Sequence, residues 1–107
     1  QQVRTLVRKA YDEAFSEFDV LICPTSPTTA FRVGERANDP LAMKLSDVCT
    51  IPVNLAGIPA ISVTCGFHER MPIGLQIMGK PFDEETVLRV AYTFEENTGY
   101  HKERPGL

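Results

Sequence analysis

Asp47 is the residue whose type and position most clearly suggest chemistry. It begins the segment DVCTIPVNLAGIPAISV, in which the thiol of Cys49 is the only other ionisable group. A carboxylate beside an apolar segment is exposed to water, serves as a cap or pairs with a cation, because burial without a partner costs several kcal/mol. The residues alone leave two readings of Asp47 open. It is a ligand-binding carboxylate or, as is more common, a residue with a local structural role.

Other candidate groups carry weaker signals. His68 and His101 are possible general bases by residue type only, since His68 lies in the polar stretch FHERMP and His101 in the charged tail YHKERPGL. No serine, histidine and aspartate can be recognised as a catalytic triad. The residues alone therefore identify no catalytic group.

The segment GLQIMGKP, residues 74–81, superficially resembles the phosphate-binding pattern G-x-x-x-x-G-K-[ST]. Pro81 stands where that pattern needs a hydroxyl group for Mg²⁺, and the four residues between the glycines alternate like a strand. We therefore interpret this segment as a core strand that ends in a turn.

Composition limits the class of protein. The chain has 107 residues, 43% hydrophobic and 23% charged, so we expect one globular domain at most. The formal net charge of −3 disfavours a nucleic-acid-binding face. Prolines and glycines interrupt the longest uncharged run, residues 48–67, so no membrane segment is predicted.

The three cysteines, Cys23, Cys49 and Cys65, form no C-x-x-C pair. This spacing predicts no metal site, and the thiols are interpreted as small hydrophobic groups of a reduced, cytoplasmic protein.

The elements that must position Asp47 follow from periodicity. Apolar residues over 3–18 recur at helical spacing, and the run DVLIC, residues 19–23, is typical of a strand buried on both faces. The helical pattern begins without a capping residue, so we expect the chain to be part of a longer protein. A short helix is predicted from Pro40, followed after Pro52 by a helical turn that ends at Gly57.

The second half predicts a hairpin and a helix. Residues 60–67 and 72–79 alternate like antiparallel strands, and Asp83 can cap the final helix. The apolar stripe of that helix is predicted to be Val87, Leu88, Ala91, Tyr92 and Phe94, with Gly99 at its end. The expected fold is an α/β sandwich piece with a mixed three-stranded sheet.

The strings DVLICPTSPTTAF, DPLAMKLSDVCTIPVNLAGIPAISVTCGF and PIGLQIMGKPFDEETVLRVAYTFEENTGYHKERP resemble the C-terminal part of the amidase signature family. The resemblance covers essentially all of the chain. It is closest to the glutamine-hydrolysing subunits that serve tRNA-dependent amidation. It implies an α/β/α sandwich with a mixed sheet, of which residues 1–107 form a partial amidase domain.

The resemblance also implies a division of roles. Family catalysis uses two serines and a lysine that lie in an N-terminal half absent from this sequence, so no catalytic residue is expected in this chain. The position that matches Asp47 binds the α-ammonium group of glutamine. The ammonia released from glutamine passes to a B subunit, which uses ATP and Mg²⁺ to activate Glu-tRNA(Gln), in a cytoplasmic complex that also contains a C subunit.

Two alternatives stay open at this point. The chain could belong to a stand-alone amidase that hydrolyses small amides, or it could be a non-catalytic packing or association module. In either case, a part of a larger sandwich exposes sheet edges and helix faces, so self-association is expected.

Overall fold

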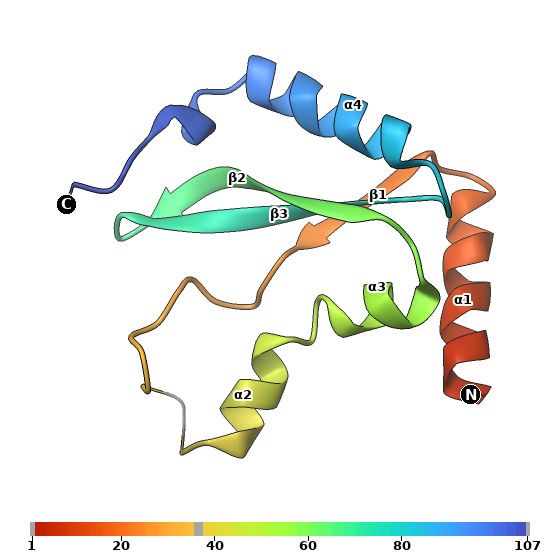
Figure 1. The fold of residues 1–107 in the computed structure, drawn as a ribbon, viewed down its shortest axis with the longest axis horizontal. Coiled ribbons are helices and arrows are strands. Elements are labelled where there is room, and N and C mark those ends of the chain that lie inside the picture. The colour runs from red at the N-terminus through yellow and green to blue at the C-terminus, as the bar shows by residue number, and fades with distance from the viewer. Residues whose placement is uncertain (1, 36–37, 107) are drawn as a thin grey trace.

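The computed structural model describes residues 2–35 and 38–106, apart from the side chain of Ala42. Four α-helices and three strands follow one another in an α/β arrangement (Figure 1). In chain order they are α1 (Gln2–Phe15), β1 (Val20–Pro24), α2 (Pro40–Ser46), α3 (Ile51–Ala56), β2 (Ala60–His68), β3 (Met71–Gly79) and α4 (Glu84–Glu96), followed by the 3₁₀ helix η1 (Tyr100–Lys102). Every predicted element is therefore present.

The strands form one sheet in the order β1-β3-β2, with β3 in the middle. Both pairings are antiparallel, and Ile77 of β3 lies opposite Ile22 of β1 on one side and Ile61 of β2 on the other. The prediction of a mixed sheet is thus wrong for the strands that this chain supplies. β1 and β2 do share a direction, but β3 lies between them, so they form no parallel ladder.

Helices cover both faces of the sheet, with α4 on one face and α1 and α3 on the other (Figure 1). On the α4 side, Val63 and Ile77 pack with Val87 and Ala91 of the helix. The opposite cluster consists of Phe15 of α1, Val53 of α3 and Met78 of β3. Because successive side chains of a strand point to opposite faces, Ile77 and Met78 serve two different cores.

β1 differs from its prediction. It was expected to be buried on both faces, but it pairs with β3 alone among the described strands, and Ile22 is 63% exposed. Leu21 and Cys23 still pack into the cluster under α1 and α3, and Val20 into the cluster under α4. Residues of β1 therefore contribute to both hydrophobic clusters, while Ile22 lies exposed on a strand at the edge of the sheet.

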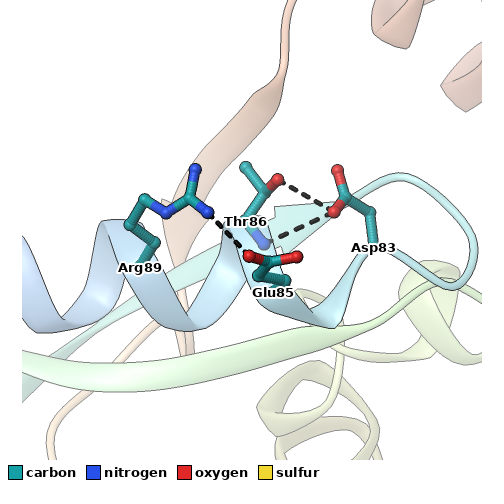
Figure 2. A network of polar contacts seen from close by, with 4 residues as sticks. All are labelled: Asp83, Glu85, Thr86 and Arg89. Carbon is teal, nitrogen blue, oxygen red and sulfur yellow. Dashed lines mark hydrogen bonds and ion pairs between the residues drawn. The ribbon is translucent and has the colours of Figure 1, made fainter.

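The apolar face of α4 that packs on the sheet also differs in part from its prediction. Asp83 caps the helix as predicted, accepting hydrogen bonds from the backbone N–H and the Oγ1 hydroxyl of Thr86, and an ion pair joins Glu85 to Arg89 one turn on (Figure 2). The side chains that pack on the sheet are Val87, Val90, Ala91 and Phe94.

The other predicted members of that stripe, Leu88 and Tyr92, are 57% and 64% exposed. They were misassigned because apolar residues fill more than one face of this helix, and periodicity alone does not say which face the sheet covers. The helix ends at Glu96 with Asn97 as its cap, earlier than the predicted Gly99.

Substitution of Ile77 tests the position of the core. Ile77→Ala should lower the free energy of unfolding by about 2–5 kcal/mol, because this side chain is buried between β3 and α4. Its cross-strand partner Ile22 provides the matched control, and Ile22→Ala should cost no more than about 0.5 kcal/mol. Urea denaturation of the 107-residue chain measures both, and equal losses would contradict the assignment.

Candidate functional site

Asp47 lies in the turn between α2 and α3, directly after the last residue of α2. Its backbone carbonyl accepts hydrogen bonds from the N–H groups of Thr50, at 3.1 Å, and Ile51, at 3.0 Å. The Thr50 hydroxyl also donates to this carbonyl, at 3.2 Å. The backbone of Asp47 is therefore tied to the start of α3, where Pro52 is tolerated in the first turn because no donor is needed there.

The side chain of Asp47 has a different status from its backbone. It is exposed, and within residues 2–35 and 38–106 no hydrogen bond or ion pair involves its carboxylate. Asp83 shows the contrast, since its carboxylate caps α4. The reading of Asp47 as a side-chain cap is thus not supported by the described residues, and its carboxylate is available to a ligand.

Gln76 is a functional candidate that the sequence analysis missed. Among the described residues, Gln76 is the only buried residue with a polar or charged side chain, and it is 5% exposed. Its side-chain amide nitrogen donates to the carbonyl of Cys49, at 2.9 Å, and to the Sγ atom of Cys23, at 3.2 Å. Gln76 thereby links the central strand to the turn that carries Asp47.

A signal for Gln76 was present in the sequence. An amide side chain stands in the strand GLQIMG at a position between apolar neighbours, and a buried polar residue is more informative than a buried apolar one. Sequence alone could not identify its partner, because Cys49 lies 27 positions away and approaches only through the fold.

A second polar contact lies further along the same face of the sheet. The hydroxyls of Thr25 and Ser62 are 2.6 Å apart, and the N–H of Thr25 donates to the carbonyl of Gly74. A Cβ atom at Gly74 would lie 2.8 Å from both hydroxyl oxygens, so a side chain there would force Thr25 or Ser62 to move. The missing side chain at Gly74 thus leaves room for the hydroxyls of Thr25 and Ser62 to meet over β3.

One titration in the neighbouring core is perturbed. The pKa of the Tyr11 phenol is raised, first by burial and second by the nearby thiol of Cys23. The direction of this pKa shift agrees with the packing of Tyr11 against the cluster of Phe15, Val53 and Met78.

The two histidines lie on other elements. His68 ends β2 and lies 3.9 Å from the Glu69 carboxylate, with both side chains exposed. His101 belongs to η1, and its buried Nδ1 atom has no partner in the described structure. Among the described residues, no hydrogen bond or ion pair joins either histidine to Asp47 or Gln76, so neither candidate base is linked to the candidate site.

The segment 74–81 forms the end of β3 and the turn after it, as interpreted from its alternation. Within the described ranges, no cluster of three or more His, Cys, Asp and Glu side chains could hold a metal ion. No described helix has the length and apolar character that a membrane crossing requires.

The α/β/α layering agrees with the fold of amidase-signature enzymes. The Amidase family model matches residues 1–88, and the chain belongs to this family. The family resemblance and the α/β sandwich class expected from the sequence are thus confirmed.

The chain is also similar in sequence to particular proteins of known name. The chain is 62% identical over 104 residues to the A subunit of glutamyl-tRNA(Gln) amidotransferase from Methanosarcina mazei, and 62% identical over 106 residues to its counterpart from Desulforamulus reducens. These matches cover 97% and 99% of this chain. The chain spans 22% of the length of each of these relatives.

A solved structure gives the same comparison in three dimensions. The crystal structure of the A subunit of glutamyl-tRNA(Gln) amidotransferase from Thermotoga maritima superposes with a TM-score of 0.87 at 44% identity. The superposition covers 92% of this chain and 22% of that one.

Two aspartates that could both serve as caps test the status of Asp47. Asp83→Ala should lower the free energy of unfolding by about 1 kcal/mol, because it removes the cap of α4. Asp47→Ala should change it by no more than about 0.5 kcal/mol, because its carboxylate has no partner in the described chain. Parallel urea titrations compare the two variants. A loss at Asp47 that equals the loss at Asp83 would assign Asp47 a structural role.

Proposed function

We propose that the chain is the C-terminal portion of the A subunit of a glutamyl-tRNA(Gln) amidotransferase, and that Asp47 binds the α-ammonium group of glutamine. Identity of 62% to proteins of that name, over almost the whole chain, supports the first part. The unpartnered, exposed carboxylate on an ordered turn supports the second, and it is the observation on which the assignment to Asp47 depends.

The chemistry of glutamine explains why such a carboxylate is needed. Free glutamine carries an α-ammonium group and an α-carboxylate, and an enzyme that selects it must pair both. A carboxylate that accepts a charge-assisted hydrogen bond from an ammonium group binds about twice as strongly as a neutral acceptor. Because hydrogen bonds from Thr50 and Ile51 already fix the Asp47 backbone, pairing with the ligand costs only the rotamer freedom of the side chain.

In this proposal the chain contributes substrate binding and scaffold rather than the nucleophile. The two serines and the lysine that hydrolyse glutamine belong to another part of the full-length protein. The released ammonia passes to the B subunit, which activates Glu-tRNA(Gln) with ATP and Mg²⁺ in a cytoplasmic complex that includes a C subunit. No resident cofactor is proposed for residues 1–107.

One observation favours a role in assembly beside substrate binding. Large apolar side chains are exposed on three helices, among them Leu6 of α1, Leu41 of α2 and Tyr92 of α4. Such faces are typical of surfaces that pack against other protein. We propose that they contact the remainder of the full-length protein, and the expected self-association of the isolated chain stays a prediction.

Kinetics of the full-length, assembled protein test the role of Asp47. Asp47→Ala and Asp47→Asn should raise KM for glutamine by roughly 10- to 100-fold, because a hydrogen bond to a charged group contributes about 1.5–3 kcal/mol. The turnover of saturating glutamine should fall much less, since Asp47 binds substrate before and during the reaction. Asp19→Ala is the control, because Asp19 is an exposed carboxylate paired with Lys80. An unchanged KM in the Asp47 variants would refute the assignment.

The isolated chain tests the location of the nucleophile. The purified 107-residue polypeptide should release no ammonia from glutamine, because the proposed catalytic serines and lysine are not among its residues. The full-length protein, assayed in parallel, should hydrolyse glutamine. Turnover by the isolated chain would show that it contains its own nucleophile.

A further inference from the structure

We infer that Gln76 is a positioning residue for glutamine binding, which acts by fixing the turn that presents Asp47. This inference rests on the proposed function of Asp47. Gln76 lies in a largely apolar strand, yet the inference gives it a role in the affinity for substrate.

The orientation of the Gln76 amide follows from its neighbours. Its Nε2 atom lies 2.9 Å from the Cys49 carbonyl oxygen and 3.2 Å from the Cys23 Sγ atom. Both neighbours accept hydrogen bonds, so the NH₂ end of the amide must face them, and both of its hydrogens are used. The side chain is therefore held in one orientation, with 5% of its surface exposed.

The contact with Cys49 reaches Asp47 through a single peptide unit. The carbonyl of Cys49 and the N–H of Thr50 belong to the same planar group. Its oxygen accepts from Gln76, and its N–H donates to the Asp47 carbonyl at 3.1 Å. In a trans peptide these two bonds point in opposite directions, so two hydrogen bonds in series connect the sheet to the backbone of Asp47.

Packing of the core alone does not account for an amide at this position. Met78, two residues further along β3 and on the same face, fills the core with an apolar side chain. A buried amide costs free energy unless it is hydrogen-bonded, so leucine or methionine would pack at position 76 without that cost. What the amide adds is a donor for the Cys49 carbonyl, and hence a fixed turn.

The test uses the full-length, assembled protein with the substitution Gln76→Met, which keeps the length of the side chain and removes both donors. KM for glutamine should rise about tenfold, the equivalent of one lost hydrogen bond, while turnover at saturation changes by less than about twofold. Thr86→Val is the matched control, since it removes the 2.8 Å hydrogen bond to Asp83 on the opposite side of the sheet. Its KM should stay unchanged.

The double variant Gln76→Met/Asp47→Ala separates positioning from general destabilisation. If Gln76 acts through Asp47, the double variant should have the KM of Asp47→Ala alone, because an unpositioned turn no longer matters once the carboxylate is gone. The inference would be overturned if the fold-increase in KM of the double variant equalled the product of the increases in the two single variants. An unchanged KM in Gln76→Met would also overturn it. If the methionine variant does not assemble, Gln76→Leu, which also lacks a donor and carries no charge into the buried site, replaces it in the same comparison.

The failures of the two claims are distinguishable. An unchanged KM in Asp47→Ala would refute the role of Asp47 and the role of Gln76 with it. A raised KM in Asp47→Ala, together with an unchanged KM in Gln76→Met, would refute the positioning role alone.

Discussion

The alternation of side chains along β3 is the constraint from which the rest of the structure follows. β3 lies between the two other strands, and both of its faces are covered by helices. Ile77 points to α4, while Gln76 and Met78 point to α1 and α3. A slip of one residue would exchange these faces, placing the amide in the α4 core and removing the support of the turn at Asp47. Core packing and presentation of the candidate site therefore depend on the same register.

Much of this fold could be predicted from local pattern. The hairpin, the cap at Asp83 and the break between α2 and α3 each depend on residues close in sequence, and each is present. The predictions that were wrong concern how the helices and strands are arranged against one another, not whether they form. The mixed sheet and the doubly buried β1 required knowing which strand lies between which, and the stripe of α4 required knowing which of its apolar faces the sheet covers.

The candidate site, too, could be predicted from the sequence only in part. Asp47 was recognisable because a lone carboxylate stands beside an apolar segment, although its residue type did not separate a cap from a ligand. The structure gives no support to the cap, since the backbone of Asp47 is hydrogen-bonded while its carboxylate is unpartnered in the described chain; the ligand role is the proposal. Gln76 could not be connected to Asp47 from sequence, because the link passes through one peptide group contributed by a distant turn. Long-range contacts of this kind require the tertiary structure.

The central claim is that Asp47 recognises the positive charge of the substrate. The most direct test is the ratio of kcat/KM for glutamine to kcat/KM for its analogue that lacks the α-amino group, measured in the full-length wild-type protein and in Asp47→Asn. The account predicts that the wild type strongly prefers glutamine and that the variant loses most of this preference. The same ratio in both proteins would contradict the account.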